Sequence, residues 1–148
     1  MYKWKGSLVP KEISHIAVGE TIMSMNPIYT QEDTEAILQA ALDYVEGWYY
    51  GNADRMEHAL HAKLAKRRVT PTGEVWEVNK DWMVEATGNG QGCIDEPARG
   101  RKDVTILDGT ATMCSVKIVS EKFVDYLHLA KDTDGWAIVN VLWDFIEP

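Results

Sequence analysis

Hydrophobic and polar positions follow a helical period between residues 30 and 51. The apolar residues of this segment recur every three or four positions, as Ile37, Leu38, Ala41, Val45 and Trp48. Such spacing is typical of an amphipathic helix. Thr30, followed three residues later by Asp33, has the spacing of a capping box, and Gly51 is a typical helix stop. We therefore expect a helix of about five turns that ends near Gly51.

Two shorter helices and two short strands are predicted between residues 52 and 87. Asn52 is a good N-cap for a second helix over residues 53–64, and Asn79 precedes a third helix that ends near residue 87. The stretches 65–71 and 73–79 have strand character, and residues 88–103 are loop by composition. The basic run KLAKRR, residues 63–68, is interpreted as a solvated helix end that complements the helix dipole.

From residue 103 onward the hydrophobic period changes to two. Residues 103–120, 121–131 and 135–145 read as three long strands, or as four if Asp108 and Gly109 form a tight turn. Residues 132–135 close the last hairpin. Because the helices come first and the antiparallel strands come last, the sequence predicts an α+β domain and not an alternating α/β one.

The register of the last hairpin decides which of its side chains share a face. A four-residue turn pairs Lys131 with Trp136 and places Asp125 opposite Leu142. One face then carries Phe123, Asp125, Leu127, Leu129, Ile138, Asn140, Leu142 and Asp144, and the other carries Val124, Tyr126, His128, Val139, Val141, Trp143 and Phe145. In a sheet with one side in water, one face is apolar and the other is polar. Here both faces are largely apolar, so we expect both to be covered. A turn one residue shorter or longer would exchange the faces of one strand.

Three helices can cover only one of these faces. We expect a second copy of the chain to cover the face with Tyr126, His128 and Trp143, which would make a two-fold homodimer. The N-terminal arm is the second candidate for covering this face. Asp125 and Asn140 would then point toward the helices. An unpaired carboxylate there is costly, so Asp125 either lines a pocket or forms a structural hydrogen bond, for example with Tyr44. Both interpretations stay open.

Composition limits the classes of partner. A chain of 148 residues fits one domain, which we place at residues 30–148 after an irregular arm at residues 1–29. The net charge of −8 disfavours nucleic acid, no apolar run is long enough for a membrane span, and no signal-peptide pattern is visible, so a cytoplasmic location is expected.

Metal and cofactor signals are weak. Cys93 and Cys114 form no CxxC pair, and Asp54, His58 and His61 share a predicted helix face but lack the glutamate of a HEXXH motif. The glycines of GNGQG lack the strand and helix of a phosphate loop. We therefore expect neither a metal site nor a bound cofactor.

Two stretches carry a family resemblance. LDYVEGWYYGNADRMEHALHAKLAKRRV, residues 42–69, and KFVDYLHLAKDTDGWAIVNVLWDF, residues 122–145, resemble the lumazine-binding branch of the nuclear transport factor 2-like superfamily. The resemblance covers roughly residues 33–146 and is most specific at Gly47-Trp48-Tyr49, at Leu60-His61 and at the hairpin that begins with Asp125. It implies a cone-shaped α+β fold in which helices pack on a strongly curved antiparallel sheet. Relatives with this fold include ketosteroid isomerase and polyketide cyclases as well as members that only bind or dimerise.

Three functions are consistent with these residues. The first is a small-molecule-binding domain, in which Tyr44 and Trp48 wall a small, partly aromatic ligand and Asp125, Asn140 and His61 orient it. The second is an isomerase or dehydratase with Asp125 as general acid or base and His61 or Tyr44 as its partner. The third is a non-catalytic dimerisation module with a filled cone.

Overall fold

Three α-helices and a six-stranded sheet make up residues 29–147, the part of the chain that this computed structural model describes. All but the last residue of the predicted arm at residues 1–29 therefore lie outside the described residues. The helices are α2 (Gln31–Tyr50), α3 (Ala53–Ala59) and α4 (Lys80–Gly88), and a 3₁₀ turn, η2, spans Pro97–Arg99. The strands are β1 (Leu60–Val69), β2 (Val75–Val78), β3 (Lys102–Gly109), β4 (Met113–Ser120), β5 (Phe123–Asp132) and β6 (Gly135–Phe145).

The first and third helices begin and end near their predicted positions. The Thr30 side chain accepts a hydrogen bond from the Asp33 backbone, and the Asp33 carboxylate accepts one from the Thr30 backbone, so the predicted capping box is complete. Gly51 ends α2 in the left-handed conformation with φ of 65°, which glycine adopts without steric cost. The Asn79 side chain accepts a hydrogen bond from Trp82 N and begins α4.

The second helix is shorter than predicted, and the prediction for residues 60–64 is wrong. Helix α3 ends at Ala59, and Leu60 begins β1, which pairs with β6. Met56, Leu60 and Leu64 are all buried. Their spacing of four residues is compatible with a helix face and also with one face of a strand, because four is close to one helical turn and is an even number. The spacing of these apolar residues therefore did not distinguish a helix from a strand at residues 60–64.

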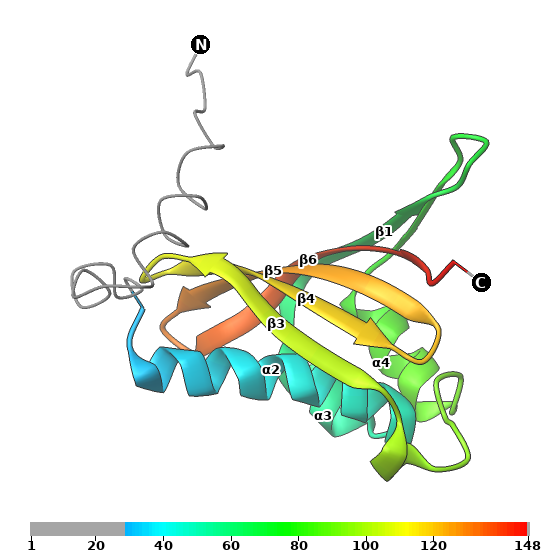
Figure 1. The fold of residues 1–148 in the computed structure, drawn as a ribbon, viewed down its shortest axis with the longest axis horizontal. Coiled ribbons are helices and arrows are strands. Elements are labelled where there is room, and N and C mark those ends of the chain that lie inside the picture. Colours follow the sequence, from blue (N-terminus) through cyan, green and yellow to red (C-terminus); the bar gives the residue numbers. More distant parts are fainter. Residues whose placement is uncertain (1–28, 148) are drawn as a thin grey trace, which may run out of the picture.

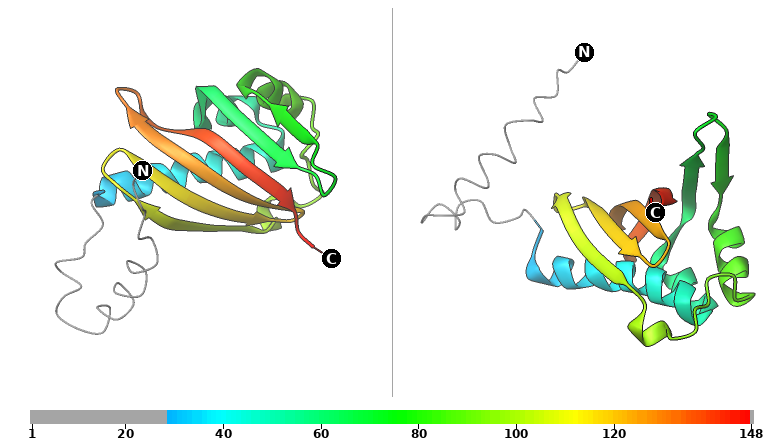
Figure 2. Two further views of the ribbon diagram at one scale, coloured as in Figure 1. Left: turned by 90° about the horizontal axis from the view of Figure 1, so that it is seen from above. Right: turned by 45° about the vertical axis from the view of Figure 1, so that its right-hand side comes forward.

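The sheet has the order β2-β1-β6-β5-β4-β3, and all its neighbouring pairs are antiparallel except the parallel pair β1–β6. Figure 1 and Figure 2 show a strongly curved sheet with the helices on one side, and the β1–β2 hairpin extends away from the rest of the sheet. The prediction that three helices cover one face only is confirmed. None of the described helices combines the length and hydrophobicity needed to cross a lipid bilayer.

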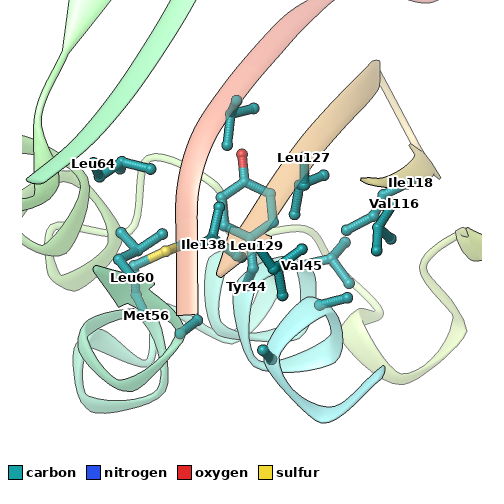
Figure 3. Packing of buried hydrophobic residues seen from close by; sticks show 14 of the residues in the cluster. Tyr44, Val45, Met56, Leu60, Leu64, Val116, Ile118, Leu127, Leu129 and Ile138 are labelled. Atoms are coloured by element: carbon teal, nitrogen blue, oxygen red, sulfur yellow. The ribbon is translucent and has the colours of Figure 1, made fainter. Parts of the chain in front are cut away.

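The core lies between the helices and the concave face of the sheet. Figure 3 shows Tyr44 and Val45 of α2 and Met56 of α3 facing strand residues such as Leu127 and Ile138. These side chains are almost completely buried. Their removal from water is the main stabilising contribution that such packing makes to a domain of this size.

A β-bulge changes the register of the last hairpin. Lys131 pairs with Trp136 and Leu129 with Ile138, as predicted, around a turn in which Asp132 pairs with Gly135. Between His128 and Leu129 the register shifts, because β6 carries an extra residue. Beyond this point the predicted register is wrong: Asp125 lies opposite Trp143, not opposite Leu142.

The bulge exchanges the two faces of β6 beyond it. Val141 is buried in the core, whereas Asn140, Leu142 and Asp144 are exposed on the face away from the helices. Trp143 lies on the helix-covered face, so its predicted place beside Tyr126 and His128 is wrong. The exchange buries the bulky apolar residues Val141 and Trp143 and leaves an amide and a carboxylate in water, which is the favourable arrangement.

Candidate functional site

A cavity of about 610 Å³ opens on the helix-covered side of the sheet. Helices α2 and α4, the β1–β2 hairpin and the ends of β5 and β6 surround it. Its aromatic lining residues are Tyr44, Trp48, Trp76, Trp82, Phe123, Trp143 and Phe145, and its polar ones include Lys66, Arg68, Glu74, Ser120 and Asp125. The cavity is therefore a mainly aromatic space with a few polar groups, the usual character of a small-molecule site.

Three polar side chains from three elements meet at the floor of this cavity. Lys66 Nζ of β1 donates to the hydroxyl of Tyr44 on α2 at 2.6 Å, and this hydroxyl donates to Asp125 Oδ1 of β5 at 3.1 Å. Lys66 Nζ lies 3.6 Å from the same Oδ1. The side chains of Lys66 and Asp125 are only 12% and 4% exposed. We refer to Lys66, Tyr44 and Asp125 as the polar floor.

Burial governs the protonation of the polar floor. It raises the pKa of Tyr44 well above its ordinary value, because a phenolate would lose its hydration, and the negative charge of Asp125 adds to the effect. Burial also lowers the pKa of the Lys66 ammonium, and the nearby Asp125 carboxylate opposes that shift. Tyr44 therefore stays a neutral donor at neutral pH, and Lys66 gives up a proton more easily than an exposed lysine does.

The walls of the cavity are a set of aromatic rings in contact with one another. Trp76 meets Trp82 and Trp143 edge to face, and Trp143 meets Phe123 and Phe145 in the same way, with ring centroids 5.2 to 5.5 Å apart. Such T-shaped pairs are favourable beyond the area they bury. The walls therefore offer flat apolar surfaces to a bound ring.

Charged side chains cover part of these walls. The Arg68 guanidinium lies 4.8 Å from the ring centroid of Phe145 and forms an ion pair with Asp144 at 2.8 Å. The ion pair lowers the pKa of Asp144, chiefly through the hydrogen bond from Arg68. Arg68 therefore already has an anionic partner near the cavity.

The structure brings together some of the predicted site residues and separates others. Tyr44, Trp48 and Asp125 all line the cavity. His61, the second residue of β1, lies outside this lining, with Nε2 3.9 Å from Asp132 Oδ2. Asn140 lies outside it too, because the bulge turns it to the opposite face of the sheet, where it and His128 line a groove of about 700 Å³.

Trp48 is held in place by the loop after α4. A side chain at position 92 would collide with the Trp48 indole, so Gly92 of the GNGQG segment permits close packing of the loop on this ring. Both α2 and this loop thus fix one wall of the cavity. Gly92, one of the glycines considered for a phosphate loop, thus serves packing here.

The sequence did not reveal most of the other cavity-lining residues as such, among them Lys66 and Trp143 and also Arg68, Trp76, Trp82, Phe123 and Phe145. Lys66 was grouped with the basic run at residues 63–68 and was read as part of a helix end. The predicted strand over residues 65–71 contains Lys66 but begins too late. A strand that begins at Leu60 would have found this residue, because Leu60, Leu64 and Lys66 then point to the same side. The Trp143 indole nitrogen is buried and has no hydrogen-bond partner among the described residues.

The predicted dimer residues Tyr126 and His128 lie on the face of the sheet away from the helices. Tyr126 is 46% exposed and its cross-strand neighbour Leu142 is 56% exposed. We refer to the exposed apolar side chains of this face, Tyr126, Leu142, Leu107 and Met113, as the outer sheet surface. Within residues 29–147, no cluster of three His, Cys, Asp or Glu side chains could hold a metal ion.

A comparison with protein families gives one match. The family model described as "Putative lumazine-binding" matches residues 32–144, which is more than half of the chain. This range contains the whole polar floor and nearly all of the aromatic walls. No curated protein matches the chain.

Solved structures with a similar fold share little sequence with this chain. An NTF2-like protein of unknown function from Methylobacillus flagellatus KT has a TM-score of 0.66 at 18% identity, with 82% of this chain and 98% of that chain covered. One from Shewanella baltica OS155 has a TM-score of 0.63 at 16% identity, covering 79% and 96%. A ketosteroid isomerase-like protein from Erwinia carotovora atroseptica SCRI1043 has a TM-score of 0.59 at 13% identity, covering 80% and 100%. These similarities support a common fold and nothing further.

Proposed function

Since the chain belongs to the lumazine-binding family of the nuclear transport factor 2-like superfamily, we propose that it binds a small, planar, partly aromatic molecule in its cavity. The cone-shaped α+β fold places the cavity between the helices and the curved sheet. Trp48 and Tyr44 on one side and the tryptophans of β2, α4 and β6 on the other would enclose the ligand.

The observation that carries this proposal is the polar floor beneath aromatic walls. A volume of about 610 Å³ is within the range of roughly 300–1,000 Å³ that is common for small-molecule sites. Replacing a buried ion pair by packed apolar residues is often neutral or stabilising, so stability alone gives little reason for Lys66 and Asp125 to meet here. A ligand that uses these polar groups gives such a reason.

Truncation of one aromatic wall tests the binding proposal. The probe ligands are lumazine, riboflavin and a steroid ketone, and isothermal titration calorimetry measures their affinities for the full chain. We expect at least one probe to bind and Trp82→Ala to weaken it about tenfold, because Trp82 lines the cavity and aromatic contacts of this kind contribute on the order of 1 kcal/mol beyond area burial.

Tyr50→Ala is the matched control for this substitution. Tyr50 is also an exposed aromatic residue at the end of a helix, but it does not line the cavity. We expect it to bind the probes as the unchanged chain does. Absence of binding by all three probes, or equal losses in both variants, would contradict the proposal.

Acid–base catalysis is the second candidate function, and the contacts of Asp125 favour it. The carboxylate lies in a mainly aromatic cavity and accepts a hydrogen bond from the Tyr44 hydroxyl, and the Lys66 ammonium 3.6 Å away would stabilise negative charge developing on a substrate oxygen. Tyr44 is therefore the partner of Asp125 in this candidate mechanism. His61, the other partner considered from the sequence, lies outside the cavity lining.

Hydrogen–deuterium exchange of a ketone tests this second candidate. Proton NMR in D₂O would follow exchange next to the carbonyl of androst-5-ene-3,17-dione. If Asp125 is the base, Asp125→Asn should slow protein-dependent exchange by roughly 10²–10⁴-fold, whereas Asp134→Asn, in the exposed β5–β6 turn, should not change it. Equal exchange rates in both variants and the unchanged chain would rule out Asp125 as the base.

We also propose a two-fold homodimer that forms through the outer sheet surface. Its apolar residues lie on one exposed face of the sheet, and the helices cover the opposite face. A C₂ interface needs such a self-complementary patch. If the cavity bound no ligand, this association would be the remaining function of the domain.

A further inference from the structure

The polar floor has one donor that its protein partners do not use. An ammonium group carries three N–H donors. One N–H of Lys66 is donated to the Tyr44 hydroxyl at 2.6 Å, and Nζ lies 3.6 Å from Asp125 Oδ1, which is an ion-pair distance. The Lys66 side chain donates no other hydrogen bond within residues 29–147, and its Nζ also lies 5.2 Å from the ring centroid of Tyr44 and 5.4 Å from that of Trp143. At least one N–H of Lys66 thus has no hydrogen-bond acceptor and can donate to one that enters the cavity.

Asp125 provides an unused acceptor beside this donor. Its Oδ1 accepts from the Tyr44 hydroxyl, but Oδ2 accepts no hydrogen bond from the described residues. Asp125 lines the cavity, so the 4% of its side chain that is exposed faces the cavity. A buried acceptor of this kind needs a donor to offset its desolvation.

A donor and an acceptor side by side select a ligand edge with the reverse pattern. We infer that the ligand is a planar heterocycle with a lactam edge, in which a ring carbonyl accepts from Lys66 and the adjacent ring N–H donates to Asp125. This inference rests on the proposed binding function and specifies the class of ligand. A flat ring suits the aromatic walls, because it can pack its face or its edge against their rigid rings.

Other ligand classes fit the polar floor less well. A carboxylate or phosphate would pair with Lys66 but would place a second negative charge next to Asp125, and Arg68 is already paired with Asp144. A cationic ligand would meet the same conflict at Lys66. A purely apolar ring would displace water and leave both Lys66 and Asp125 without their missing partners, which costs affinity. A neutral lactam satisfies both groups without adding charge.

Three bicyclic probes of similar size separate the lactam edge from ring stacking. Lumazine carries lactam edges, 1,3-dimethyllumazine keeps the carbonyls but has no ring N–H, and quinoxaline has neither group. Calorimetric titration of the full chain should show lumazine binding at least about tenfold more tightly than the other two, because each leaves a buried polar group unpaired.

Variants of the polar floor then locate this preference. Lys66→Met keeps a long side chain but removes the donor, and we expect it to reduce the preference for lumazine over quinoxaline to about twofold or less. Lys63→Met, an exposed position on the same strand, is the matched control and should keep the full preference. Circular dichroism checks that both variants fold. If Lys66→Met does not fold, the comparison of the three probes on the unchanged chain still decides.

The outcomes separate this inference from the proposed function. If the three probes bind equally, the lactam inference is wrong, whereas the binding function is supported. If lumazine is preferred and Lys66→Met keeps that preference, the assignment to the polar floor is wrong. If no probe binds, both the inference and the proposed function fail.

Discussion

Asp33 connects the start of α2 to the β5–β6 hairpin. Its Oδ1 accepts hydrogen bonds from Lys131 Nζ at 2.8 Å and from Trp136 Nε1 at 2.9 Å, while Oδ2 accepts from the Thr30 backbone at 3.1 Å. These donors, Lys131 first, hold the pKa of Asp33 well below its ordinary value. One carboxylate thus completes a helix cap and fixes the hairpin that carries Asp125.

Removal of this carboxylate should give a pH-dependent loss of stability. Because the pKa of Asp33 is lower in the folded than in the unfolded state, its contribution is present above the unfolded value near 3.8 and is lost as the pH falls toward the folded value. We expect Asp33→Asn to lower the urea midpoint at pH 7. The difference in urea midpoint between this variant and the unchanged chain should become smaller below about pH 4. Unfolding followed by circular dichroism at several pH values measures this.

An exposed aspartate serves as the control for this prediction. Asp134→Asn, in the β5–β6 turn, should change the urea midpoint little at any pH, because it lacks these three donors. If the difference in urea midpoint between Asp33→Asn and the unchanged chain were the same from pH 7 to pH 3, ionisation of the Asp33 carboxylate would contribute no stability.

At the scale of elements, the local signals of the sequence predicted what depends on local contacts. The capping box at Thr30 and Asp33, the periodic apolar face and the stop at Gly51 all lie within α2, and its boundaries were predicted within a residue. The same holds for Asn79 at the start of α4. Caps and turns need only neighbouring residues, so one segment contains all the information.

Elements that depend on distant contacts were not predictable in this way. The parallel pairing of β1 with β6 joins residues far apart in the chain and has no local sequence signal. The bulge is hidden because residues 139, 141, 142 and 143 are all apolar, so both faces of β6 look suitable for burial. The sequence therefore placed Asp125, Tyr44 and Trp48 on the side of the sheet where the cavity lies but placed Asn140 and Trp143 on the wrong faces.

At the scale of the whole molecule, the two faces of the sheet have separate uses in our proposals. The cavity opens on the helix-covered side, and the outer sheet surface lies on the other side. Figure 2 shows the sheet between these two sides. Dimerisation through the outer sheet surface would thus leave the polar floor and aromatic walls unchanged, which makes the two proposals independently testable.

A charge on the outer sheet surface should therefore separate association from binding. Leu142 is 56% exposed and pairs with Tyr126, so Leu142→Glu should fold normally. At a two-fold interface it would bury a carboxylate from each subunit and weaken self-association by at least about a hundredfold, since burial of an unpaired charge costs several kcal/mol. Size-exclusion chromatography with light scattering should show a dimer for the unchanged chain and a monomer for Leu142→Glu.

The same variant also tests the independence of the cavity. Leu142→Glu should bind the lumazine probe within about twofold of the unchanged chain, because position 142 points away from the cavity. Tyr50→Glu, an exposed control on α2, should stay dimeric. A monomeric unchanged chain at tens of micromolar would overturn the dimer proposal and leave the binding proposal intact, whereas a monomeric Leu142→Glu that lost the probe would show that the partner subunit supports the site.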